Sequence, residues 1–278
     1  MPVITISRGT LSGGEALANL LSARTGYPVI GLEVIKDAAA QYGISESAIS
    51  KQLNQGPRVL ERLAVDKRRI YVIAVQSALA ERALQGAFIY HGLAGHLLLH
   101  GIPNVLKVRL VAPLSYRVKS VVEKKRLTEE EAIKYIGTVD EKRKQWTKFL
   151  YDVDWTDPML YDVVINLAQV TLDSACGMIK YALDQPEFKD SPEKQKAIED
   201  FALSSRVKAR LALDERTRGV ETAVEAKEGR VVVRGRLFTT STLLATGTQS
   251  TKAHVQEIAK ALPGVKELSI DITESPIA

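Results

Sequence analysis

The residues with the clearest chemical meaning form a glycine-rich segment near the N-terminus, Gly9-Thr10-Leu11-Ser12-Gly13-Gly14. Four residues separate its outer glycines, and it lies between a β-branched run at 3–7 and a helical pattern at 16–24. This is the spacing of a P-loop, in which backbone N–H groups and the start of the next helix hold phosphate oxygens. Gly9, Ser12, Gly13 and Gly14 are therefore candidate phosphate-binding residues.

The two positions after this loop depart from the P-loop pattern. A P-loop continues with a lysine that reaches the outer phosphates and a serine or threonine that binds magnesium. Here Glu15 and Ala16 stand at those positions. Two unit charges ~4 Å apart interact by about 4 kcal/mol at an effective dielectric of ~20. Exchanging an attractive lysine for a repulsive glutamate therefore opposes phosphate binding.

Glu15 also has a structural explanation. Ser12 and Glu15 have the spacing of a capping box, in which a serine and an acid three residues later satisfy free N–H groups at a helix start. An acid there also suits the helix dipole. Two alternatives stay open: a loop that fills its anion site with its own side chains, which we prefer, and a loop that admits a nucleotide, for instance through a metal bound to Glu15.

The elements that must position this loop alternate between strands and helices. Strands are expected over 3–7, 87–90, 104–111 and 161–166, and helices over 16–24, 70–84, 114–125, 128–151 and 172–183. This alternation is typical of an α/β fold with a parallel sheet covered on both faces.

The pattern changes after residue 183. Residues 184–203 carry many charges and two prolines, and we expect a charged linker or a frayed helix there. A helix at 207–213, strands at 220–226 and 230–237, a helix at 252–262 and a strand at 266–272 follow. We therefore predict three parts: a domain over 1–183, a linker over 184–203 and a small αββαβ domain over 204–278.

Composition excludes several classes of protein. The 278 residues are 45% hydrophobic and 26% charged, as in a soluble globular chain, and no apolar run is long enough to span a bilayer. The lone Cys176 cannot form an internal disulfide, and the N-terminus has no secretory signal, so we expect a cytoplasmic protein. The net charge of +5 is spread along the chain, so we expect no nucleic-acid partner.

Three histidines lie close together in the sequence, at His91, His96 and His100. The last two have the spacing of a helical metal pair, but no cysteine or acid nearby completes a zinc site. We expect core or surface histidines there and assign no metal site.

Residues 3–183 resemble the cytidylate kinase-like family, P-loop relatives of the nucleoside monophosphate kinases. The resemblance rests on ITISRGTLSGGEALANLLSARTGYPV, VLKVRLVAPLSYRVKSVV and VDEKRKQWTKFLYDVDWTDPMLYDVVIN. In the third segment the matching residues are Asp140, Arg143, Asp154-Trp155, Asp157-Pro158, Tyr161-Asp162 and Asn166. The resemblance implies that Arg117 and Arg143 lie on a lid over the phosphates, with ATP and Mg²⁺ as cofactors if the chain is active. By residue type alone, each arginine is equally a solvated residue of a helix face.

Three departures from the family pattern remove positive charge. The family has an arginine where this chain has Glu15, an Asp-Arg pair where it has Gly31-Leu32, and Gly-Arg where it has Gly92-Leu93. Phosphoryl transfer depends almost entirely on charge placement, so these losses favour a degraded site. Arg8 and Arg69 are the basic residues that could compensate.

Residues 204–278 resemble a BON domain, through VETAVEAKEGRVVVRGRL and HVQEIAKALPGVKELSIDI. The resemblance implies a module that binds phospholipid, a small ligand or a protein partner.

The preferred interpretation is a pseudokinase: a nucleotide-sensing or scaffold protein with a BON-like adaptor. Its phosphate site would comprise Arg8, Gly9, Ser12, Gly13, Gly14 and Glu15. The first alternative is an active ATP-dependent kinase on a nucleoside monophosphate or another small acceptor, in which Arg117 and Arg143 are catalytic. The second is a binding module for phospholipid or protein, driven by the BON-like domain. The sequence alone leaves open whether the chain is an enzyme.

Overall fold

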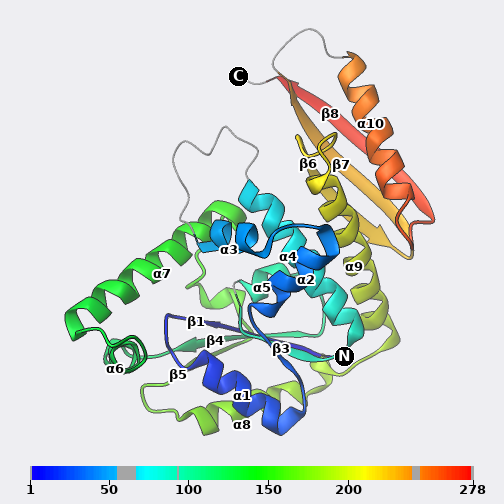
Figure 1. Ribbon diagram of the computed structural model, residues 1–278. Helices are drawn as coiled ribbons and strands as arrows, with labels where there is room; N and C mark the ends of the chain where they lie inside the picture. The colour runs from blue at the N-terminus through cyan, green and yellow to red at the C-terminus, as the bar shows by residue number, and fades with distance from the viewer. Residues whose placement is uncertain (1, 55–66, 93, 240–244, 277–278) are drawn as a thin grey trace. The chain divides into compact units, whose positions relative to one another are not determined.

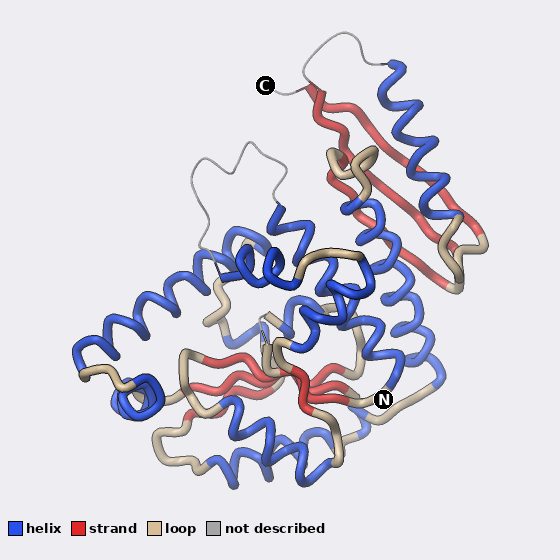
Figure 2. Tube along the Cα trace, viewed as in Figure 1, coloured by secondary structure: helices blue, strands red, loops and turns tan. Residues whose placement is uncertain are grey.

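The computed structural model describes residues 2–54, 67–92, 94–239 and 245–276. The chain forms two compact units. The first contains the described residues of 1–33 and 85–191, and the second those of 34–54, 67–84 and 192–278. Figures 1 and 2 show the helices and strands of both units.

A five-stranded sheet with the order β2-β3-β1-β4-β5 forms the centre of the first unit. The central strand β1 (Val3–Arg8) pairs in parallel with β3 (Phe88–Tyr90) and β4 (Val105–Val111). The edge strands β2 (Val29–Ile30) and β5 (Val163–Asn166) are also parallel to their neighbours. The predicted parallel sheet is therefore confirmed.

Helices cover this sheet. The helices α1 (Gly14–Thr25) and α8 (Leu172–Leu183) contact each other on one face, and the short α5 (Gly95–Leu98) contacts β1 and β4 on the other (Figure 1). The core between the sheet, α1 and α8 includes Ile6 and Leu21, both almost fully buried, and the fully buried Cys176. Because β1 and α1 are fixed in this core, the glycine-rich loop between them has fixed ends.

The helices α6 (Leu114–Lys125) and α7 (Glu129–Tyr151) pack against each other around a small core of their own. Thr128 caps α7 through a capping box with Glu131. Leu11 of the glycine-rich loop packs against the same small core. The helix pair is therefore in direct contact with the loop.

A mixed sheet lies in the second unit. The strand β7 (Arg230–Thr239) pairs antiparallel with β6 (Val220–Lys227) and parallel with β8 (Glu267–Pro276). The helix α9 (Pro192–Leu213) contacts β6, and α10 (Ala245–Lys260) contacts β8. Their shared core includes Val207, Val233 and Val255, all fully buried. The small α+β unit expected from the sequence is therefore present.

Of the two alternatives expected for residues 184–203, a charged linker or a frayed helix, the second half is a helix. The segment over 192–203 is helical and continuous with the predicted helix at 207–213, so that α9 has 22 residues. Ile198 and Ala202 are fully buried, at a spacing of four residues that places them on one helix face. The charged residues around them, such as Glu199 and Asp200, concealed this narrow apolar stripe in the sequence.

The second unit also contains three helices from the N-terminal half: α2 (Glu33–Tyr42), which begins at the boundary between the units, α3 (Glu46–Asn54) and α4 (Lys67–Gln85). Arg82 of α4 donates two hydrogen bonds to the carboxylate of Asp37 of α2, from Nε at 2.7 Å and from Nη2 at 2.9 Å. Arg206 of α9 donates two hydrogen bonds to Glu81 Oε1, at 2.6 and 2.8 Å. These ion pairs connect α2, α4 and α9.

We expect the Arg206–Glu81 pair to stabilise the protein, because only about a quarter of each side chain is exposed, 22% and 26%. Arg206→Glu should lower the free energy of unfolding by about 1–2 kcal/mol, between the values for exposed and buried pairs. The double variant Arg206→Glu with Glu81→Arg should recover most of that loss in urea titrations. The control Arg218→Glu alters an exposed pair with Glu215. If the loss in free energy of unfolding of the double variant equals the sum of the losses of the two single variants, the pairing is contradicted.

Candidate functional site

The glycine-rich loop begins after Arg8, the last residue of β1, and leads into α1 at Gly14. Gly13 is the N-cap of α1 and has a φ of 81°, a left-handed conformation that favours glycine. Within the described residues, this glycine N-cap makes no side-chain cap hydrogen bond, so it leaves the first N–H groups of α1 without a side-chain acceptor from the N-cap residue.

The predicted capping box is wrong. A capping box needs Ser12 as the N-cap and Glu15 at the third helical position, but Gly13 is the N-cap, which shifts the register by one residue. The Ser12 Oγ is buried without a hydrogen-bond partner in the described structure. The carboxylate of Glu15 is largely exposed and lies 3.6 Å from Lys124 Nζ of α6. The loop does not fill its own anion site.

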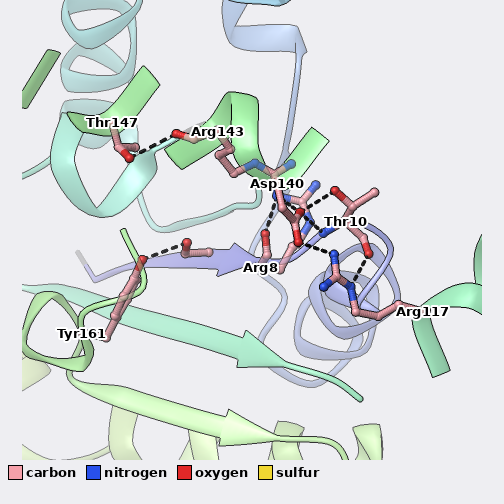
Figure 3. A network of polar contacts seen from close by, with 8 residues as sticks. Arg8, Thr10, Arg117, Asp140, Arg143, Thr147 and Tyr161 are labelled. Atoms are coloured by element: carbon pink, nitrogen blue, oxygen red, sulfur yellow. Dashed lines mark hydrogen bonds and ion pairs between the residues drawn. The ribbon is translucent and has the colours of Figure 1, made fainter. Parts of the chain in front are cut away.

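Asp140 of α7 binds the backbone and side chain of the loop (Figure 3). Its Oδ1 accepts hydrogen bonds from Thr10 N at 3.1 Å and Thr10 Oγ1 at 2.7 Å. Its Oδ2 accepts one from Arg117 Nη2 at 2.5 Å, and Arg117 Nε donates to Thr10 O at 2.9 Å. Burial alone would raise the pKa of Asp140, but the bonds from Thr10 and Arg117 hold this pKa below its usual value.

Two more arginines lie at the loop. Arg143 of α7 lies 3.8 Å from Asp140 Oδ1, and its Nη1 donates to the carbonyl oxygen of Arg8 at 2.7 Å. The side chain of Arg8 lies over the start of α1, since a Cβ added at Gly14 would be 1.9 Å from Arg8 Cδ. Burial, followed by the charge of Arg143, lowers the pKa of Arg8 to about 10. A strand arginine therefore provides a cation near the position where a P-loop has its lysine.

A cavity of about 270 Å³ opens beside the loop and the helix pair. Its polar and charged lining includes Gly9 and Ser12 from the loop, Arg109 from β4, Arg117 from α6, and Asp140, Glu141 and Lys144 from α7, with Trp155 and Thr156. Three cations against two acids give this lining an excess of positive charge.

A buried polar cluster lies around Tyr161. The hydroxyl of Tyr161 donates to Trp155 O at 2.7 Å and lies 3.2 Å from His96 Nε2 and 3.1 Å from Ser7 Oγ. Burial, with the charges of Arg109 and Lys107, lowers the pKa of His96 to about 4. The expectation of a core histidine therefore holds for His96, and no group of metal-binding side chains occurs among the described residues.

The structure brings most of the predicted site residues together. Arg117 and Arg143 lie at the loop, as do Arg8, Gly9, Ser12, Gly13 and Gly14, whereas the side chain of Glu15 is directed to Lys124. Arg69 instead pairs with Glu221 in the second unit, at 2.5 Å. Leu93, at one of the three charge-losing departures, lies outside the described residues.

Sequence reasoning missed Thr10, Arg109 and Lys144 and gave Asp140 no role. Thr10 and Asp140 are 130 residues apart, so no local pattern could connect them. Arg109 and Lys107 are the two charged residues in the apolar strand β4, and this was the one available signal for Arg109.

In a P-loop, a serine or threonine hydroxyl binds Mg²⁺, and the side chains at this loop do not provide that ligand. Ala16 has no hydroxyl, and the carboxylate of Asp140 is engaged by Thr10 and Arg117. The positive charge of this site comes from guanidinium groups.

The parallel sheet, the glycine-rich loop that ends in a helix start, and the helix pair beside it define an α/β P-loop kinase-like fold. A sequence model of the cytidylate kinase-like family matches residues 3–169, more than half of the chain. The chain belongs to the cytidylate kinase-like family.

The N-terminal two thirds of the chain match nearly the whole length of two curated relatives. The chain is 28% identical over 186 residues to the cytidylate kinase of Methanosarcina acetivorans, covering 65% of this chain and 96% of that protein. It is 27% identical over 191 residues to the cytidylate kinase of Methanopyrus kandleri, covering 68% and 97%. A solved structure of an uncharacterized protein from Eubacterium ventriosum has a TM-score of 0.52 and 21% identity, covering 66% and 98%, and supports the fold. Within the described ranges, no helix is long and apolar enough to cross a membrane.

We expect Asp140→Asn to lower the free energy of unfolding by about 2 kcal/mol, because it removes the negative charge that accepts bonds from Thr10 and Arg117. Urea titration measures the loss. Asp173→Asn, which alters an exposed pair with Arg24, should cost much less. Equal stability of Asp140→Asn and the wild type would show that this carboxylate does not hold the loop.

The pKa of His96 predicts a pH dependence of stability. Because the pKa falls from 6.5 to about 4 on folding, protons bind the unfolded chain more tightly. The contribution of neutral His96 is complete above pH 6.5 and is lost as the pH falls from there toward 4. We expect the wild type to lose about 2 kcal/mol between pH 7 and 4.5 that His96→Gln does not lose. The exposed His100→Gln should keep the wild-type slope, and parallel curves for all three proteins would refute this assignment.

Proposed function

We propose that the glycine-rich loop binds the phosphate groups of a nucleotide. The observation that carries this proposal is the start of α1: its N-cap, Gly13, makes no side-chain cap hydrogen bond, and the Ser12 Oγ has no hydrogen-bond partner in the described structure. A helix start with free N–H groups attracts anions. The buried Ser12 Oγ, which has no partner in the described structure and lines the cavity, is a further group that a phosphate oxygen would satisfy.

Arg8, Arg117 and Arg143 supply the positive charge in this proposal. Arg8 lies over Gly14, and the largely exposed carboxylate of Glu15 lies 3.6 Å from Lys124 Nζ. Burial lowers the pKa of Arg143, and the positive charge of Arg117 lowers this pKa further. The negative charge of Asp140 acts in the opposite direction. Asp140 alone neutralises only one of these guanidinium groups. A phosphate group would relieve their mutual repulsion.

The reaction that we propose is phosphoryl transfer from ATP to a nucleoside monophosphate. Membership of the family and the names of the archaeal relatives support this reaction, and CMP is the first acceptor to test. The chain's own part is to orient the phosphate chain on the loop amides and to stabilise negative charge with arginines. Because the side chains at the loop do not fit a Mg²⁺ ligand set, no step depends on a protein-bound metal.

A second candidate is nucleotide binding without turnover, as in a pseudokinase that senses nucleotides or acts as a scaffold. Ala16 at the magnesium position and the uncharged Gly31-Leu32 favour it. In both candidates the loop binds a nucleotide, and they differ only in chemistry.

We also propose that residues 204–278 are a BON-like module that binds a phospholipid or a protein partner. The mixed three-stranded sheet with α9 and α10 packed on its core agrees with this resemblance. Alternate residues of β6 and β7 are exposed, and Glu225 pairs with Arg234 among them at 2.6 Å. The adaptor role in the pseudokinase interpretation would belong to this polar face.

Calorimetric titration with ATP, combined with a coupled assay with CMP, tests the proposed function. We expect saturable binding that weakens about tenfold in Arg8→Gln, the loss of one charge-assisted interaction with phosphate. The control Lys180→Gln alters an exposed pair with Asp184 and should bind as the wild type. Binding with turnover supports the kinase, and binding without turnover supports the second candidate. Absence of saturable binding at millimolar ATP contradicts both.

A further inference from the structure

Two guanidinium groups contact the indole of Trp155. The Cζ atom of Arg109 lies 4.8 Å from the ring centroid and that of Arg143 lies 5.6 Å from it. Trp155 is only 5% exposed, so these cation–π contacts are largely shielded from water. One aromatic ring therefore restrains an arginine from β4 and an arginine from α7.

The backbone of Trp155 restrains Arg109 as well. Its carbonyl oxygen accepts a hydrogen bond from Arg109 Nη1 at 2.5 Å and one from the Tyr161 hydroxyl at 2.7 Å. The cluster around Tyr161 reaches Ser7, the residue before Arg8 on β1. Arg109 is thus fixed by both the ring and the carbonyl of one residue, and that residue is connected to the strand that leads into the loop.

Arg109 has no carboxylate within ion-pair distance in the described part of the chain, although it lines the cavity beside the loop. Lys107 lies two residues earlier on the same strand. Unlike Arg109, it forms an ion pair, with Asp162 at 3.3 Å. Arg109 is thus held from two sides, while Asp154, whose charge also acts on it, lies beyond ion-pair distance. The place of Arg109 beside Gly9, Ser12 and Lys144 indicates an external anion.

We propose that Arg109 is a further phosphate-binding residue of this cavity, and that Trp155 is a positioning residue that holds Arg109 toward it while its ring also contacts Arg143. The inference rests on the proposed function and names the part of the ligand that the cavity takes. The loop amides hold one end of a polyphosphate chain, and the cavity takes a phosphate group further along it. Ligands with longer polyphosphate chains should therefore depend more strongly on Arg109.

The test measures binding of ATP, AMP and inorganic tripolyphosphate to the full chain by calorimetry. We expect Arg109→Gln to weaken the binding of ATP and tripolyphosphate about tenfold and the binding of AMP by less than about threefold. Lys107→Gln, on the same strand, is the matched control and should bind all three ligands within twofold of the wild type. The response to tripolyphosphate separates recognition of phosphate from recognition of the nucleoside.

A second set of variants tests Trp155. Phe keeps an aromatic face for the two guanidinium groups and Leu does not, so Trp155→Phe should retain ATP affinity within threefold while Trp155→Leu loses about tenfold. The chain has two tryptophans, so Trp146→Phe leaves Trp155 as the only one. Its fluorescence should change saturably with ATP, and far-ultraviolet circular dichroism checks that each variant is folded.

The outcomes separate the two proposals. Equal ATP and tripolyphosphate affinity in Arg109→Gln and Lys107→Gln, with binding by the wild type intact, overturns the role of Arg109 and leaves the proposed function standing. Equal loss in Trp155→Phe and Trp155→Leu overturns the positioning role of the ring. No saturable binding of either polyphosphate by the wild type overturns the proposed function and this inference together.

Discussion

The arrangement of the site depends on one carboxylate, that of Asp140. It accepts hydrogen bonds from the glycine-rich loop through Thr10 and from α6 through Arg117, and it lies beside Arg143 on its own helix. Without this negative charge, Arg117 and Arg143 would repel each other at a site where burial already disfavours the charged form of Arg143. This one carboxylate therefore joins the loop, the helix pair and two of the arginines.

The sequence predicted the features that depend on local patterns. The β-branched run at 3–7, the glycine spacing and the helical periodicity after it gave β1, the loop and α1, because each signal lies within a few residues. The capping box failed because spacing cannot decide whether Ser12 or Gly13 is the N-cap, and the left-handed Gly13 decides it. The contacts of Arg8 with Gly14 and of Asp140 with Thr10 depend on tertiary packing and have no local signal.

The structure changes the interpretation of the lysine that is missing from the loop. From the sequence, Glu15 puts a negative charge at the mouth of the loop. In the structure this carboxylate is directed to Lys124, and cations reach the loop region from the strands, as Arg8 and Arg109, and from the helix pair. The positive charge of this site therefore comes from the strands and the helix pair around the loop, and not from the helix that follows the loop. Such a redistribution is compatible with the family to which residues 3–169 belong.

The central claim is that the backbone amides at the start of α1 are free to bind phosphate. Nuclear magnetic resonance of ¹⁵N-labelled protein during addition of tripolyphosphate tests it most directly. The account predicts saturable shifts of the Gly13 and Gly14 amide resonances, accompanied by those of Thr10 in the loop. Unchanged resonances at Gly13 and Gly14, with shifts confined to exposed lysines, would contradict it.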